Sequence, residues 1–420
     1  MRCEEGGYSN LVQKKVLSDN DLTDRDRSFY TALFLGTLSR RITLDAMLSP
    51  FLKKGIESLD PEVRNILRCG VYQIFWMDKV PTRAAISESV DLCRIFRKSS
   101  AAGMVNAVLR KVSGSDRNAI LGISDEVERL SLMYSVHPVL VRKLLEEYGE
   151  KTEEILSSTF LPDPIYVRIN TKKTSVKELL SHAGERFSET DLKNCLKLNG
   201  GIRLIEDHLN KGEVYVEGYP AQWAAAILDV HEGQRVLDLC SAPGGKTMCL
   251  AMATGDKGSV TAVELHANRS KLVKELADRL CIANIDVVCA DGTVFQEEEG
   301  FERVLCDVPC SGYGELSSKP ELRYKDPNGA GSLTELQQRL LENGASLMKK
   351  GGKLVYSTCT ILKEENEDIV RKFLLTHEDF EGCPIDLEGI PAEKISEHER
   401  KFLPCPELPE GFYVASLRKV

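Results

Sequence analysis

The sequence predicts a multidomain chain: an all-α domain over residues 1–137, a small α+β linker domain over 138–215, and an α/β domain over 216–420. Three observations support this division. Apolar residues recur at helical spacing through the first part, without strand-like alternation. Proline and glycine then punctuate short mixed segments. From about residue 219, short apolar strands alternate with helical stretches, which is typical of a doubly wound parallel sheet.

The first part contains clear helix starts. Thr23 and Asp26 have the spacing of a capping box, and Asp60-Pro61 places a capping residue before a proline at the first helical position. Residues 1–150 carry a net charge of +2, whereas the remainder carries −11. From charge alone, the basic clusters of this part are expected to be solvated faces of helices. These clusters are Arg40-Arg41, Lys53-Lys54, Arg94-Arg97-Lys98 and Arg110-Lys111.

Composition limits the class of protein. Hydrophobic residues make up 42% and charged residues 28% of the 420, the mix of a soluble globular protein. No apolar stretch approaches the ~20 residues that a membrane span needs, and the N-terminus lacks the apolar core of a secretory signal. The 13 cysteines are odd in number and have no paired spacing. We therefore expect reduced thiols in a cytoplasmic protein.

The linker is predicted from mixed signals. Residues 161–164 (Leu-Pro-Asp-Pro) end a helix, Ile165–Ile169 has strand character, Val176–Leu180 is a short helix and Val214–Val216 is a strand. No residue type in this part points to chemistry.

The third part places acids at strand ends. Its predicted strands are Arg235–Leu239, Ser259–Glu264, Ile285–Cys289, Arg303–Asp307 and Lys353–Tyr356, and its predicted helices include Ala267–Leu280 and Leu333–Leu347. Ligands of such sheets bind at the carboxyl ends of the strands. An acid at Glu264 suits the two ribose hydroxyls of an adenosine ligand, and Asp291 suits its exocyclic amine. Either acid alone could instead cap a turn, but acids at three successive strand ends indicate a binding site.

The loop after the first strand runs from Asp238 to Thr247 and contains Gly244-Gly245, which allow close backbone approach to a ligand. It is neither GxGxxG nor a phosphate-binding loop. Two cysteines, Cys310 and Cys359, follow later strands among small polar residues, where a thiolate can be exposed and activated. Buried, inert side chains are expected instead for Cys69, Cys93, Cys249, Cys281 and Cys289.

Together these stretches resemble the RNA cytosine-5 methyltransferases of the Sun/Nop2 (NSUN) type. The paired motifs Asp307–Gly312 (with Pro309-Cys310) and Tyr356–Cys359 (with Thr358-Cys359) are the specific ones. The first part resembles the NusB-like helical RNA-binding domain of the bacterial 16S rRNA methyltransferases in this group, through Asp26–Phe29, Val71–Gln73, Pro81–Glu88 and Val105–Arg110. The resemblance covers nearly the whole chain.

The resemblance implies a Rossmann-like methyltransferase domain that uses S-adenosyl-L-methionine and no metal. It implies that Cys359 attacks C6 of cytosine, that Asp307 bonds N3, that Lys246 lies near the base and lowers a thiol pKa, and that Cys310 assists loss of the C5 proton and release of Cys359. The implied cofactor-binding residues are Cys240, Ser241, Ala242, Pro243, Gly244, Gly245, Lys246, Glu264, Arg269, Asp291 and Asp307.

The implied partner is small-subunit rRNA, with an unpaired or flipped cytidine, and the implied state is a monomer away from membranes. The chain departs from the family pattern at Glu217-Gly218-Tyr219-Pro220, where members usually have Gln-Asp-x-Ser, near the methionine end of the cofactor. Two other functions remain open. A DNA cytosine-5 methyltransferase would use Cys310 as its nucleophile, and an assembly factor would keep the fold without activity. The group that takes the C5 proton is not settled.

Overall fold

The computed structural model describes residues 2–4, 6–116 and 123–420. Its contacts divide the chain into two compact units. The helical unit comprises Met1–Phe160 and Leu316–Asn328, and the sheet unit comprises Leu161–Glu315 and Gly329–Val420. The described residues up to 137 form helices and short 3-10 turns and no strand, so the predicted all-α N-terminal part is confirmed. The predicted boundaries at 137 and 215 stay a prediction, since both units are assembled from separate stretches of chain.

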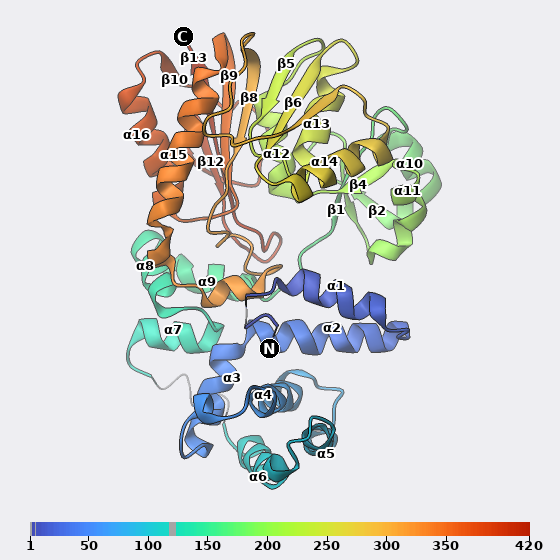
Figure 1. Ribbon diagram of the computed structural model, residues 1–420, viewed down its shortest axis with the longest axis vertical. Helices are drawn as coiled ribbons and strands as arrows, with labels where there is room; N and C mark the ends of the chain where they lie inside the picture. The colour runs from blue at the N-terminus through green and yellow to red at the C-terminus, as the bar shows by residue number, and fades with distance from the viewer. Residues whose placement is uncertain (1, 5, 117–122) are drawn as a thin grey trace. The chain divides into compact units, whose positions relative to one another are not determined.

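The helical unit consists of α-helices (Figure 1), and the sequence signals that begin α2 are present in the structure. The side chain of Thr23 caps α2 by accepting from the Asp26 amide, and Asp24 and Asp26 lie in the first turn, where the helix dipole favours acids. Leu44, Leu67 and Leu109 are fully buried in the core. Its helices are α1 (Ser9–Asp19), α2 (Asp24–Ser39), α3 (Arg41–Leu48), α4 (Pro61–Trp76), α5 (Thr82–Ile95), α6 (Ala102–Ser113), α7 (Glu126–Tyr134), α8 (Pro138–Tyr148) and α9 (Lys151–Ser158).

The segment Leu316–Asn328 lies between two elements of the sheet unit in sequence but belongs to the helical unit. Arg323 is fully buried there, donates to the carbonyls of Tyr134 (3.0 Å) and Thr159 (2.8 Å), and stacks over the Phe160 ring. The Arg41 guanidinium lies 3.9 Å from the centre of the Tyr324 ring. This segment therefore completes the core of the helical unit.

The sheet unit contains a small antiparallel sheet of the order β2-β3-β1-β4, as expected for an α+β linker. Its core includes Val167, Leu196 and Val214, all fully buried. Its elements are β1 (Tyr166–Ile169), α10 (Val176–Ala183), β2 (Phe187–Glu189), β3 (Cys195–Leu198), α11 (Glu206–Asn210) and β4 (Val214–Val216).

The large sheet has the order β11-β12-β13-β9-β8-β5-β6-β7, with β10 paired to β13. All five predicted strands are present and parallel. The sheet as a whole is mixed, because strands beyond the five predicted ones add antiparallel pairs: β13 runs antiparallel to β9 and β12 antiparallel to β13. Between β11, β12 and β13 the chain forms no helix, and antiparallel neighbours can be joined by such short connections. The strands are β5 (Arg235–Asp238), β6 (Ser259–Glu264), β7 (Ile285–Cys289), β8 (Phe301–Asp307), β9 (Met348–Thr358), β10 (Phe380–Gly382), β11 (Glu393–Ser396), β12 (Glu399–Phe402) and β13 (Phe412–Lys419).

Helices cover both faces of this sheet (Figure 1). Val236 belongs to the core cluster that contains residues of α12 (Tyr219–Leu228), α13 (Gly245–Thr254) and α14 (Ala267–Leu280). Its neighbour Leu237 belongs to the cluster that contains residues of α15 (Gly331–Ser346) and α16 (Glu367–Thr376). This alternation follows from the two-residue period of a strand. The faces are closed by helices, so the loops at the carboxyl ends of the parallel strands carry the polar groups. In the described residues no helix is long and apolar enough to cross a membrane.

Candidate active site

The glycine-rich loop after β5 is held close to the small sheet. Gly244 has φ +112°, a conformation that other residues rarely adopt, and a Cβ added to Gly245 would lie 1.4 Å from Glu217 Oε2. The Tyr215 hydroxyl donates to the Gly245 carbonyl at 3.0 Å. A side chain at 245 would displace the Glu217 carboxylate, so glycine keeps that carboxylate beside the start of α13.

Two buried polar atoms at this loop are unsatisfied. Asp238 is 1% exposed; the Thr247 hydroxyl donates to one of its oxygens at 2.7 Å, while Oδ1 has no hydrogen-bond partner in the described part of the chain. The same holds for Ser241 Oγ. Burial raises the pKa of Asp238 to about 7. Buried polar atoms without partners indicate a ligand that supplies them, and S-adenosylmethionine carries suitable donors in its ammonium and hydroxyl groups.

The predicted acids Glu264 and Asp291 differ in burial and in hydrogen-bond partners. Glu264 is 4% exposed at the end of β6, accepts from the His266 amide at 3.0 Å, and lies 3.5 Å from Arg269 Nη1. Arg269 also donates to the Ala242 carbonyl at 2.9 Å, which joins Glu264 to the glycine-rich loop. Asp291 is exposed and accepts from the Thr293 amide and hydroxyl, and these hydrogen bonds lower its pKa. Asp291 therefore caps a turn in this structure, and its role toward adenine stays a prediction.

Lys246 and Asp307 form the centre of the site. Lys246 Nζ lies 2.9 Å from Asp307 Oδ2 and 3.9 Å from Glu217 Oε1, and Ser357 Oγ donates to the other oxygen of Asp307 at 2.7 Å. Burial acts to lower the pKa of Lys246, but the carboxylates of Asp307 and Glu217 outweigh it and raise that pKa above its usual range. Lys246 therefore remains a buried cation between two acids.

The two predicted cysteines meet at the end of the same pair of strands. Cys310 follows β8 and Cys359 follows β9, and because these strands are parallel neighbours their C-terminal loops converge. The sulfur atoms lie 2.8 Å apart, neither cysteine is in a disulfide, and both side chains are half-buried. One thiol can therefore bind a substrate atom with the other within reach.

Gly218, where the chain departs from the family pattern, lies next to the carboxylate of Glu410. A Cβ added there would lie 3.2 Å from Glu410 Oε2, so the carboxylate of Glu410 borders the space that the missing side chain would enter. Burial, with the charges of Asp163, Glu315 and Glu217, raises the pKa of Glu410 to about 8. The sequence did not predict Glu217, Asp238 and Glu410 as site residues. Asp238 could have been predicted from its position, because it is the last residue of the parallel strand β5, where ligands bind.

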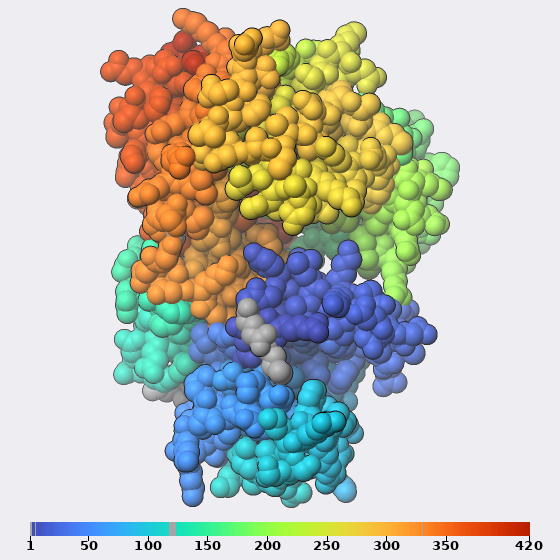
Figure 2. Space-filling model, in the orientation of Figure 1, coloured from blue at the N-terminus to red at the C-terminus, as the bar shows by residue number. Residues whose placement is uncertain are grey.

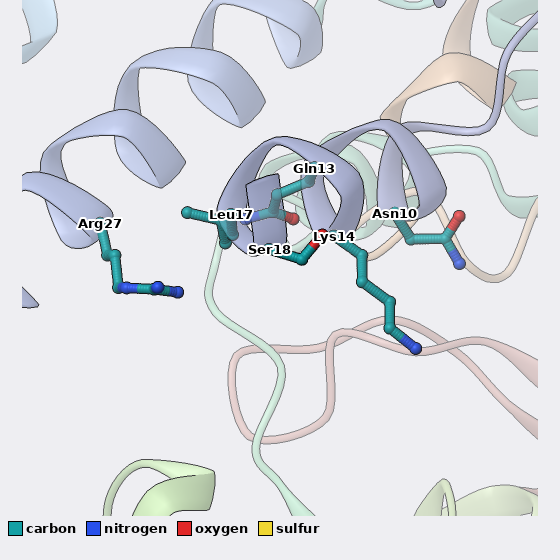
Figure 3. Close-up of a pocket in the computed structure, with 6 residues that line it drawn as sticks. All are labelled: Asn10, Gln13, Lys14, Leu17, Ser18 and Arg27. Carbon is teal, nitrogen blue, oxygen red and sulfur yellow. The ribbon is translucent and has the colours of Figure 1, made fainter. Parts of the chain in front are cut away.

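A separate hollow lies on the helical unit, between α1 and α2, with a volume of about 520 Å³. Figure 3 shows Lys14 and Arg27 extending from these two helices, and Figure 2 shows α1 (dark blue) at the surface. The lining is rich in hydrogen-bond donors and contains no acid: Asn10, Gln13, Lys14, Leu17, Ser18 and Arg27. None of these residues was predicted.

Comparisons with known proteins agree with this arrangement. The family model described as 16S rRNA methyltransferase RsmB/F matches residues 225–418, and the NusB family model matches residues 3–114. The probable ribosomal RNA small subunit methyltransferase B of Bacillus subtilis is 37% identical, over 98% of this chain and 95% of its own length. The corresponding protein of Synechocystis is 32% identical over the same shares. The crystal structure of PH0851 aligns with a TM-score of 0.83 and 26% identity, over 97% of this chain and 93% of that one.

The sheet, the glycine-rich loop and these relatives define an S-adenosylmethionine-dependent methyltransferase joined to a NusB domain. More narrowly, the chain belongs to the 16S rRNA methyltransferase RsmB/F family. The predicted family, enzyme class and cofactor are thereby confirmed.

Proposed function

We propose that this chain methylates C5 of a cytidine in small-subunit (16S) rRNA through a covalent bond between Cys359 and C6. The observation that carries the proposal is the pair of cysteine sulfur atoms 2.8 Å apart, on the loops that follow β8 and β9. Asp307 ends β8, and Lys246 pairs with it at 2.9 Å. Family membership supports rRNA as the substrate.

The residues present fit S-adenosylmethionine. The buried, unsatisfied Asp238 Oδ1 and Ser241 Oγ would accept from or donate to its methionine end, and Glu264 would bond its ribose hydroxyls. When bound, this cofactor supplies an electrophilic methyl group. The remaining chemistry falls to the chain's own residues.

Cys359 makes the substrate nucleophilic. Its thiolate adds to C6, and the electron pair of the C5–C6 double bond moves onto C5, which then accepts the methyl group. Lys246, which pairs with Asp307 at 2.9 Å, supplies a positive charge beside the base. Asp307 bonds N3 of the pyrimidine as charge develops there, which requires a proton on that carboxyl and exchange of its contact with Lys246.

Release reverses the addition. Loss of the C5 proton to a base returns the C5–H electron pair to the ring, the C6–S bond breaks, and Cys359 leaves as a thiolate. Cys310, in contact with the sulfur of Cys359, assists this elimination. The base itself must be unpaired or flipped out of the RNA, which costs a few kcal/mol and favours loops.

The helical unit is proposed to dock the RNA as a monomer. Lys53, Lys54, Arg110 and Lys111 are exposed, and Lys14 and Arg27 line the hollow of Figure 3. The side chains of the predicted basic cluster Arg40-Arg41 instead make contacts within the helical unit. Arg40 stacks on Phe160 and Arg41 on Tyr324. Phosphate contacts release counterions, so RNA binding should weaken as salt rises.

The test is methyl transfer from S-adenosylmethionine to an unmodified 16S rRNA fragment, with the product nucleoside identified by mass spectrometry. We expect 5-methylcytidine at one site, and far less transfer to a DNA of the same sequence. A methyl group on another atom, or equal activity on DNA, would overturn the proposal. Bound cofactor without transfer to any rRNA would favour an inactive assembly factor.

A further inference from the structure

We propose that two adjacent buried residues, Glu365 and Asn366, position the two thiols separately: Glu365 holds the loop of Cys310, and Asn366 holds the loop of Cys359. The proposal rests on the proposed function, in which the two thiols serve different steps. Both residues follow β9, neither touches a reacting atom, and both are fully buried.

Glu365, together with Gln337, holds the chain on either side of Cys310. Its carboxylate accepts from the Ser311 amide at 2.9 Å and from the Ser311 hydroxyl at 2.5 Å. Gln337 donates to the same carboxylate at 2.8 Å and to the Pro309 carbonyl at 3.0 Å. Hydrogen bonds to a charged acceptor are stronger than neutral ones. Thus both neighbours of Cys310 are fixed by one buried carboxylate and its amide partner.

Asn366 binds the chain on either side of Cys359. The Thr358 hydroxyl donates to its Oδ1 at 2.6 Å, and its Nδ2 donates to the Thr360 carbonyl at 2.9 Å. The position needs an acceptor and a donor on one short side chain, which asparagine offers and aspartate does not. An aspartate here would face the Thr360 carbonyl with a second acceptor.

The hydrogen bonds around Glu365 and those around Asn366 form one connected network. Thr360 Oγ1 lies 2.9 Å from Ser311 Oγ and donates to it, since the single hydroxyl hydrogen of Ser311 goes to Glu365. The Tyr356 hydroxyl donates to the Glu365 carbonyl at 2.7 Å. Among the described members of this network, Gln337 Oε1 has no hydrogen-bond partner, but both carboxylate oxygens of Glu365 and both ends of the Asn366 amide are bonded. Such bonding makes the loops rigid, which suits two thiols that must stay within reach of one carbon atom. Because Cys359 attacks and Cys310 assists release, loosening each loop should slow a different step.

The experiment compares Glu365→Gln, Asn366→Asp and the parent chain with cofactor and an unmodified 16S rRNA fragment. It measures the protein–RNA conjugate on denaturing gels and 5-methylcytidine by mass spectrometry. Displacing a reacting group by about 1 Å can cost on the order of 10²-fold. We expect Glu365→Gln to accumulate conjugate while product falls ~10-fold or more, and Asn366→Asp to lose conjugate and product together. Glu378→Gln, the same chemical change at an exposed position, should match the parent.

Binding of S-adenosylmethionine reports whether each variant is folded. Should one fail, Ser311→Ala or Thr358→Val removes a hydroxyl donor from the same network without burying a new group, and takes its place with the same expected direction. An unchanged ratio of conjugate to product in all variants of an active parent overturns this inference alone. An identical shift of this ratio in the Glu365 and Asn366 variants also overturns it. A parent that yields neither conjugate nor 5-methylcytidine overturns the proposed function, and this inference with it.

Discussion

The two halves of the site differ in how their buried polar groups are satisfied. Around the cysteines, the carboxylate of Glu365 and both ends of the Asn366 amide have partners within the chain. Around the glycine-rich loop, Asp238 Oδ1 and Ser241 Oγ are buried without a partner among the described residues.

This difference separates groups that must be placed before the substrate arrives from groups that the cofactor completes. A nucleophile works best when its surroundings are already rigid, whereas a cofactor that supplies partners to the unsatisfied atoms stabilises its half of the site. The predictions below test each half, starting with the largest effect.

The cysteine half should fail in two opposite ways. Cys359→Ser removes the nucleophile, so product and conjugate should both fall by ~10³-fold or more. Cys310→Ala should still permit attack and methyl transfer but stall release, so a denaturation-resistant conjugate accumulates. Gel electrophoresis with the rRNA fragment measures both. The reverse pattern, with conjugate from the Cys359 variant alone, would support the DNA-type assignment of the nucleophile.

Lys246 lies between the halves, so its loss should affect stability. Lys246→Met leaves the carboxylates of Asp307 and Glu217 without their cation, and removing one partner of a buried pair costs about 3–5 kcal/mol. Urea unfolding measures this loss. Lys271→Met breaks an exposed pair with Glu275 and should cost no more than ~0.5 kcal/mol. Equal losses would mean that Lys246 is not held as described.

The cofactor half should depend on the buried acid more than on the exposed one. Glu264→Ala removes a charge-assisted bond to ribose, so affinity for S-adenosylmethionine should fall by ~1.5–3 kcal/mol, about tenfold or more. Asp291→Ala should cost less, because that carboxylate is exposed and bonded to Thr293. Calorimetry on folded variants measures both. Unchanged affinity in the Glu264 variant would remove it from the cofactor site.

The smallest effect concerns pH. With a pKa of about 7 in the folded chain and ~3.9 when unfolded, Asp238 binds more protons folded, so its contribution to stability falls as pH rises from about 4 to 7. A cationic ligand favours the ionised form, so cofactor affinity should rise by at most about tenfold from pH 6 to pH 8. Calorimetry across this range tests it. Asp238→Asn should flatten both profiles, and a parent whose affinity is flat would contradict the assignment.

Sequence reasoning found the parallel strands because they are short apolar runs that end in acids or cysteines. It missed β12, which reads Glu-Arg-Lys-Phe yet is buried throughout. Lys401 is buried there because it pairs with Glu367 at 2.5 Å. A charged strand of this kind is invisible to hydrophobic patterning, since its burial depends on partners far away in the chain.

The same limit applies to single residues. Cys281 and Cys289 were expected to be buried but are exposed, because one caps the end of α14 and the other lies on the edge strand β7. Glu365 and Asn366 follow Cys359 within seven residues, but only the folded loops reveal which backbone groups they bind. Arg323 reads as a surface residue, and its burial depends on carbonyls almost two hundred positions earlier.

The interleaved path of the chain has a consequence for synthesis. The helical unit needs Leu316–Asn328, yet the 155 residues of 161–315 must be translated first. At ~5–20 residues per second, that delay is roughly 8 to 30 s. During this time the nascent N-terminal helices lack the Arg323 side chain that binds Tyr134 and Thr159. The first unit to begin on the ribosome is therefore completed only after most of the second has been made.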